Sequence, residues 1–205
     1  KAKPSRALRR FGCAVFFGLL LLAVISVLLL RIEPLISGSG IPQVELMVKG
    51  RLRMNWFRVL VCKFAGALAA LTGGLSLGRE GPCIMMGASL GVGVGRLWHD
   101  PKAAHEPRFL VGGSAAGLGA AFGAPMAGMC FAFEEMKTPL RVPMVITCAT
   151  TAFAAMYVMQ AIYGFGLVFP FGSRPMLPWE AWWLVPVVGV AMGALGVLYN
   201  TLLIR

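Results

Sequence analysis

Charged residues are scarce in this chain of 205 residues, where they make up 13% of the sequence. A soluble domain of this length carries about twice that fraction. Apolar residues account for 58%, and the mean hydropathy is +0.78. This composition excludes the charged surface of a water-soluble protein, so we expect most apolar side chains to face lipid. At this length one domain is the default, and we expect a single transmembrane domain over residues 1–205.

Acidic residues are the rarest charged groups, with 8 Asp and Glu against 19 Lys and Arg, which gives a net charge of +11. In a soluble protein this excess would indicate nucleic-acid binding. Here much of the positive charge lies in short segments between apolar runs, where the positive-inside rule explains it. The sequence also contains no RNA- or DNA-binding motif, so we expect no nucleic-acid partner.

Histidine is almost absent, and no cysteine has a metal-ligand spacing. The five cysteines stand alone in apolar runs without a CxxC pair, which predicts no metal site. The two histidines, His99 and His105, lie in a polar stretch outside the apolar runs. An intramembrane serine protease built on Ser39 would need a base beside the serine. We therefore expect no enzyme and no catalytic residue, and nothing else in the sequence indicates a cofactor.

Long apolar runs, by contrast, are plentiful. A membrane span needs about 20 apolar residues. The candidate runs are 11–30, 59–77, 81–95, 109–133 with an interruption at 123–125, 142–173 and 181–204. Small residues recur every fourth position at Gly87, Gly91 and Gly95 and again at Gly112, Ala116 and Ala120, which predicts closely packed helices.

Two glycine-rich interruptions break the apolar pattern. Residues 38–42 read GSGIP and lead into a segment long enough for only about two helical turns. Residues 78–82 read GREGP and begin another apolar run. The proline of each motif suits the first turn of a helix, where its missing N–H costs nothing. We therefore predict an all-α membrane fold with tilted and discontinuous helices.

Broken helices of this kind can bind anions within a membrane, because the first-turn N–H groups are unpaired and the helix N-terminus is positive. Non-helical backbone at membrane depth is tolerated where it lines a cavity. We therefore predict that the helix starts near Ile41 and Gly81 face a common anion site. Glu80 lies between two apolar runs, where a carboxylate is costly and indicates a functional residue. A salt bridge to Arg79 is the structural alternative, although neighbours on a helix do not face each other.

Other charged residues are candidates for buried roles. Lys63 lies within the run 59–77, and Glu45 on the preceding short helix is its expected partner. The alternative is a lysine that snorkels near a helix end. Glu134 and Glu135 end an apolar run, and the residues alone favour neither a solvated helix end nor a functional pair.

Together these segments resemble the CLC family of chloride channels and transporters. GSGIP at 38–42, GREGP at 78–82 and FAFEEM at 131–136 resemble family segments in order and spacing, and GLGAAFGAP at 117–125 resembles the segment before the family's EE pair. The resemblance implies one half of an inverted-repeat fold. The family's second half supplies a GxFxP segment and a pore tyrosine, neither of which follows residues 181–204. We therefore expect a fragment that covers most of the first repeat and the start of the second.

The resemblance also implies roles for individual residues. Glu80 would be the external gating glutamate, and Glu135 the internal proton-transfer glutamate. Glu45 and Lys63 match a family pair that supports the pore from outside it. The chloride site would comprise Ser39, which offers its hydroxyl, with Gly40, Ile41, Arg79 and Gly81. Channels of the family usually lack an acid at the position of Glu135, so the resemblance favours chloride/proton exchange, and a passive chloride channel is the alternative.

The implied partners are chloride, protons, the lipid bilayer and a second copy of the chain. In the family the homodimer interface includes the helices at about 125–135 and 147–164, and each subunit holds its own pore. The expected location is the bacterial inner membrane. A membrane scaffold without a pore would leave Glu80 unexplained.

Overall fold

The computed structural model describes residues 6–76, 78–97, 107–139, 141–164 and 178–204. Throughout these ranges the regular secondary structure is helical, which confirms the expected all-α class. The chain divides into two compact units, one up to residue 168 and the other from residue 169. Each unit is described by itself below, and a single transmembrane domain over 1–205 stays a prediction.

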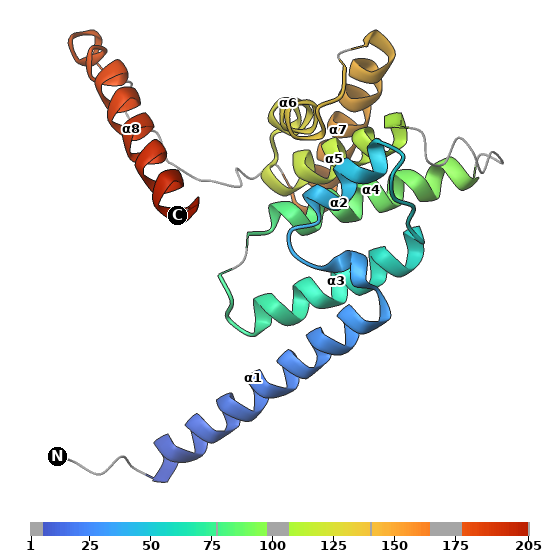
Figure 1. Cartoon of the computed structure of the whole chain (residues 1–205), viewed down its shortest axis with the longest axis vertical. Helices are drawn as coiled ribbons and strands as arrows, with labels where there is room; N and C mark the ends of the chain where they lie inside the picture. The colour runs from blue at the N-terminus through green and yellow to red at the C-terminus, as the bar shows by residue number, and fades with distance from the viewer. Residues whose placement is uncertain (1–5, 77, 98–106, 140, 165–177, 205) are drawn as a thin grey trace. The chain divides into compact units, whose positions relative to one another are not determined.

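The first unit begins with α1 (Arg6–Ile32), a long apolar helix that packs on α3 (Trp56–Thr72) (Figure 1). The contact is an ordinary one, because a Cβ at Gly66, or at Gly73 just after α3, would lie 3.9 or 3.5 Å from leucine methyl groups of α1. A short 3₁₀ turn, η1 (Pro34–Ile36), follows α1. Proline at its start cannot continue the preceding helix, so α1 ends before it.

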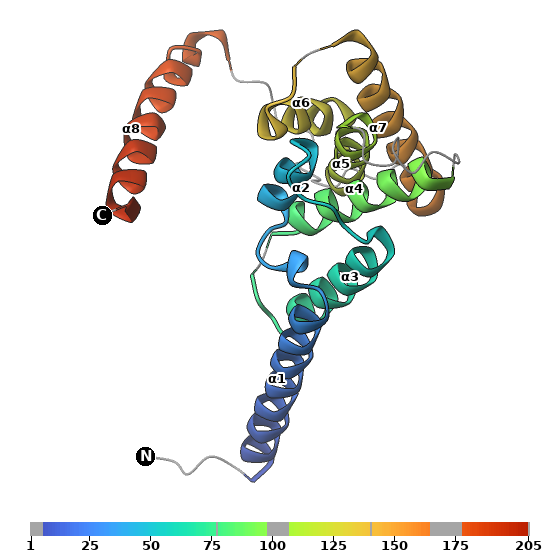
Figure 2. The same cartoon turned by 45° about the vertical axis from the view of Figure 1, so that its right-hand side comes forward.

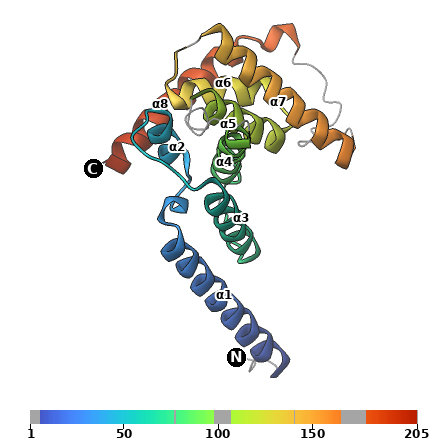
Figure 3. The same ribbon diagram turned by 90° about the vertical axis from the view of Figure 1, so that its right-hand side faces the viewer.

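Helix α2 (Ile41–Val48) has only 8 residues, as the sequence predicted for a half-span. It begins after Gly40 in the left-handed region, with φ 95°, and ends before Gly50, with φ 70°. Glycine adopts this region without a Cβ penalty, so both ends of the helix are set locally. The side chains of Val44 and Met47 are buried, and α2 lies beside α4, α5 and α6 (Figures 2 and 3).

The centre of the unit is the crossing of α4 (Glu80–Leu97) with α5 (Pro107–Phe122). A Cβ on either Gly87 or Gly113 would overlap the carbonyl oxygen of the other residue. Gly117 meets the backbone of Cys83 in the same way. The two backbones can approach this closely only because the side chains are missing.

The small residues of α5 face two different neighbours, and both contacts are close, as predicted. Gly113 and Gly117 face α4, whereas Gly112 faces α7 (Val142–Tyr163), where Thr151 Oγ1 donates to its carbonyl oxygen at 2.8 Å. Helix α5 is packed on two sides, so a repeat of four residues does not identify the closer neighbour. The run 109–133 does break where predicted, since Gly123 has φ 64° and α6 (Pro125–Met136) begins directly after it.

Three helical stretches within the described ranges are long and apolar enough to cross a membrane: Val15–Ile32, Val142–Tyr163 and Trp179–Ile204. Helix α3 has 17 residues and is shorter than these. The part of the expected run 142–173 beyond residue 164 lies outside the described residues.

The second unit consists of the 3₁₀ turn η3 (Trp179–Ala181) and α8 (Leu184–Ile204). The described residues of α8 are all exposed. Trp179 and Trp182 lie against each other just before its start, with ring centroids 5.7 Å apart and the rings tilted by 41°. Tryptophan beside a long apolar helix is typical of a membrane–water interface.

Candidate functional site

The GSGIP segment forms a tight turn that starts α2. Gly38 and Gly40 both have positive φ, 62° and 95°, which favours glycine at these positions. The exposed hydroxyl of Ser39 accepts a hydrogen bond from the Ile41 N–H at 3.3 Å. Pro42 has no N–H, so it contributes no donor to the first turn of α2. The donors at this helix start are the Ser39 hydroxyl and the other first-turn N–H groups.

The GREGP segment starts α4 at Glu80, and it meets the GSGIP turn directly. Gly81 is buried, and a Cβ there would overlap the carbonyl oxygen of Ser39 and lie 2.9 Å from its Cα. The two predicted helix starts therefore do share one region. Ser39, Gly40 and Gly81 are brought together, and Ile41 follows them at the start of α2.

Glu80 is half-buried, and its carboxylate folds back over Gly78, where an added Cβ would meet Oε2. Within the described ranges no ion pair joins Glu80 to Arg79, so the structural alternative of a salt bridge is not formed. The Arg79 guanidinium instead lies over the ring of Phe122 at the end of α5, 5.6 Å from its centroid.

Lys63 is 5% exposed and lies behind the GSGIP turn. Its ammonium donates to the carbonyl oxygens of Ile36 at 2.8 Å and Gly38 at 2.7 Å. A buried ammonium must be hydrogen-bonded, and these two carbonyls are acceptors of the turn that precedes α2. Lys63 also lines a hollow of about 250 Å³ with residues of α1, η1 and α4.

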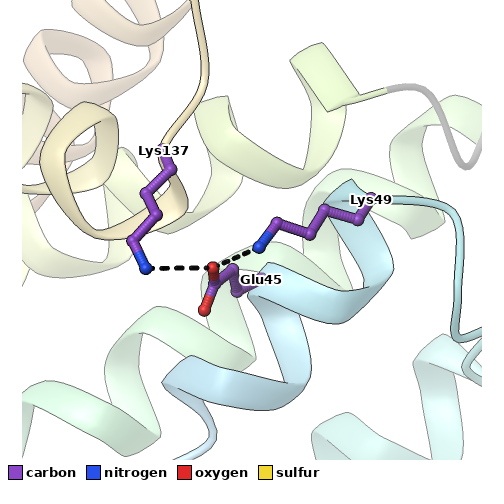
Figure 4. Close-up of polar contacts among 3 residues, drawn as sticks. All are labelled: Glu45, Lys49 and Lys137. Carbon is purple, nitrogen blue, oxygen red and sulfur yellow. Dashed lines mark hydrogen bonds and ion pairs between the residues drawn. The ribbon is translucent and has the colours of Figure 1, made fainter.

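The expected pair of Glu45 with Lys63 was therefore wrong. Glu45 accepts from Lys49 of its own helix at 2.5 Å and pairs with Lys137 at 3.6 Å (Figure 4). The carboxylate in the second turn of α2 points to the end of α6, whereas Lys63 reaches the turn before α2. The spacing of Glu45 and Lys49, four residues apart on a helix, was a sequence signal for the observed partner.

Glu134 and Glu135 are both exposed in the last turn of α6. Their next charged neighbour in the chain, Lys137, caps this helix. No hydrogen bond or ion pair between described residues connects Glu135 to Ser39 or Glu80. The roles of Glu80 and Glu135 remain predictions.

Metal ligands do not cluster in the described part of the chain, where no group of three His, Cys, Asp or Glu side chains could hold an ion. Cys62, Cys83, Cys130 and Cys148 are free. His99 and His105, which the protease alternative would need, lie outside the described residues.

The sequence and the fold match known proteins. A family model described as "Voltage gated chloride channel" matches residues 21–205. The chain belongs to this family of membrane proteins. The chain is 36% identical over 193 residues to an H(+)/Cl(-) exchange transporter ClcA of Cronobacter sakazakii, covering 93% of this chain and 41% of the relative.

A second relative, the H(+)/Cl(-) exchange transporter ClcA of Yersinia pestis, is 37% identical over 182 residues, covering 85% of this chain and 37% of the relative. The crystal structure of a slow cyanobacterial Cl-/H+ antiporter aligns with a TM-score of 0.80 at 28% identity, over 91% of this chain and 44% of that chain. The chain thus spans about two fifths of the length of these proteins. The CLC resemblance and its membrane fold are confirmed.

Proposed function

We propose that the full-length protein exchanges chloride for protons across a membrane. The observation that carries this proposal is the backbone contact between Ser39 and Gly81, which places two helix N-termini together beside Glu80. The relatives named as H(+)/Cl(-) exchange transporters support the choice of ions.

Chloride binds where the positive ends of α2 and α4 meet. The Ser39 hydroxyl and the backbone N–H groups of Ile41 and Gly81 supply donors of the kind that replace an anion's hydration shell. The buried ammonium of Lys63 fixes the backbone of the turn and adds a positive charge behind it. Gly40 permits the turn, and Arg79 adds charge at the rim.

Glu80 acts as the gate in this proposal. A half-buried carboxylate at the start of α4 competes with chloride for the same donors when it is ionised, and it leaves them when it is protonated. This competition links the movement of the two ions. Because Glu80 has no ion pair with Arg79, its carboxylate is available for the exchange.

The gate is tested by Glu80→Gln in the full-length protein. The amide has the shape of a protonated carboxylic acid but can neither carry a proton nor compete as an anion. We expect chloride flux to remain and proton flux to disappear, measured in parallel in reconstituted vesicles. Proton transport at the wild-type ratio in this variant would exclude Glu80 as the gate.

The internal proton path is assigned to Glu135, with Glu134 as the matched control. Both side chains are exposed in the last turn of α6, and either substitution by Gln removes one negative charge near Lys137. We expect Glu135→Gln to abolish proton transport and spare chloride flux, while Glu134→Gln leaves both nearly intact. Equal loss in the two variants would show a general electrostatic effect and contradict the assignment.

A passive chloride channel is the competing function within the same fold. The two are separated by the reversal potential under opposed chloride and pH gradients. An exchanger shifts its reversal potential with the pH gradient, whereas a channel follows chloride alone.

We further propose a homodimer in the bacterial inner membrane, with the chain crossing the membrane several times. The interface would lie on the parts of α6 and α7 at about 125–135 and 147–164, where Met126, Phe153 and Ile162 are exposed apolar side chains. Cross-linking of the full-length protein in detergent tests this, and a product that is only monomeric would count against it.

A further inference from the structure

The end of α6 has an unusual backbone. Lys137, its C-cap residue, has φ 47° and ψ 40°, in the left-handed region. It is the one residue other than glycine with positive φ in the described ranges. A side chain with a Cβ is disfavoured there, and glycine is the usual residue where a helix ends in this way. A lysine at this position therefore needs a reason.

The lysine side chain supplies that reason. Its Nζ lies 3.6 Å from Oε1 of Glu45 on α2, and Lys49 Nζ lies 2.5 Å from the same oxygen (Figure 4). The side chain of Glu45 is 22% exposed and that of Lys137 is 72% exposed. So exposed a pair adds little to fold stability. Stability alone therefore does not explain why a lysine occupies a position suited to glycine.

The pair connects two helices that carry different parts of the proposed site. Helix α2 starts at the GSGIP turn and extends for only about 12 Å. Glu45 lies in its second turn, and Lys137 follows Glu135 by two residues. One carboxylate thus links the helix that presents the anion-facing turn to the last turn of the helix that carries Glu135.

We propose that Glu45 and Lys137 are positioning residues that hold the last turn of α6, and with it Glu135, in register with α2. The inference rests on the proposed function, since it assigns Glu135 to the proton path.

Lys137→Gly is the informative substitution, because it removes the ion pair and also relieves the left-handed backbone. We expect the thermal midpoint of the full-length protein in detergent to stay at or above the wild-type value. In vesicles, the ratio of proton to chloride flux should fall about two- to fivefold, the size that a partly exposed ion pair can support. A merely structural role would not separate these two readouts.

Lys49→Met is the matched control. It removes the same charge and a partner of the same carboxylate, but Lys49 caps α2, the helix of Glu45 itself, and so does not join two helices through this contact. We expect the flux ratio to remain at the wild-type value in this variant. Glu45→Gln should lower the ratio as Lys137→Gly does, and the two together should lower it no further, because both break one contact.

The measured flux ratios distinguish failure of this inference from failure of the proposed function. A normal flux ratio in Lys137→Gly, an equal fall in Lys49→Met, or additive effects of Glu45→Gln and Lys137→Gly would each overturn the positioning role. If the wild-type protein moves no protons at all, the proposed function itself fails. A wild type that exchanges normally beside an unaffected Lys137→Gly rejects this inference alone.

Discussion

Gly81→Ala is the sharpest perturbation of the candidate anion site, because it adds one methyl group and removes no donor. The new Cβ would overlap the carbonyl oxygen of Ser39 and lie 2.9 Å from its Cα and from its Cβ. The obstructing atoms belong mainly to the backbone, so no rotamer change relieves them. The two helix starts must separate to admit the methyl group.

The size of the separation follows from the contact distances. Ordinary van der Waals contacts of a Cβ begin at 3.4 Å, so the 2.9 Å contacts must open by at least about 0.5 Å. Overpacking of this kind costs about 1–3 kcal/mol. If the strain is relieved by moving the donors apart, about 1.4 kcal/mol of lost binding corresponds to a tenfold rise in the Kd for chloride.

The assay is chloride titration calorimetry on the full-length protein in detergent, with the thermal midpoint recorded for the same samples. Gly66→Ala on α3 is the control, since its Cβ would meet only a leucine methyl at 3.9 Å. We expect about tenfold weaker chloride binding in Gly81→Ala and wild-type binding in Gly66→Ala. Wild-type chloride affinity in Gly81→Ala would refute the claim that this backbone contact shapes the site.

Two further substitutions test the surroundings of the site. Lys63→Met should lower both the thermal midpoint and chloride affinity, because the carbonyls of Ile36 and Gly38 lose charge-assisted hydrogen bonds worth about 1.5–3 kcal/mol each before the relief of ammonium desolvation. Lys63→Arg, which keeps the charge, should retain more of the affinity. Gly113→Ala should lower the midpoint through overpacking of about 1–3 kcal/mol against the backbone of Gly87, whereas Gly193→Ala on α8, where the space is open, should not.

Local sequence features predicted the parts of the fold that depend on single residues. Glycine with positive φ and proline in a first turn act within a few residues, so the starts of α2 and α4 could be placed from GSGIP and GREGP. The break before α6 followed from Gly123 in the same way. Their convergence on one site was predicted from the unpaired donors and the dipole, which are also local properties of a helix end.

The partners of the charged residues were harder to predict from the sequence, because they depend on how helices that are distant in the sequence pack together. Lys63 was expected to find a carboxylate, yet a buried ammonium is satisfied equally by backbone carbonyls. Glu45 and Lys137 are 92 positions apart in the sequence, and no pattern in either segment indicates that they pair. Only the contact with Lys49, four residues along the same helix, was accessible to a local rule.

The geometry of the candidate site depends on two glycines, at which any side chain would collide with neighbouring atoms. Gly40 and Gly81 are both intolerant of a Cβ, but for different reasons. At Gly40 the added atom would lie 2.6 Å from Sδ and 2.9 Å from Cβ of Met85, and φ 95° is a second obstacle. At Gly81 the obstacle is the Ser39 backbone, which is itself held through the Gly38 carbonyl by Lys63. The buried lysine and the missing side chain therefore act on the same turn, one through the Gly38 carbonyl and one at Ser39, and both constrain the distance between the two helix starts.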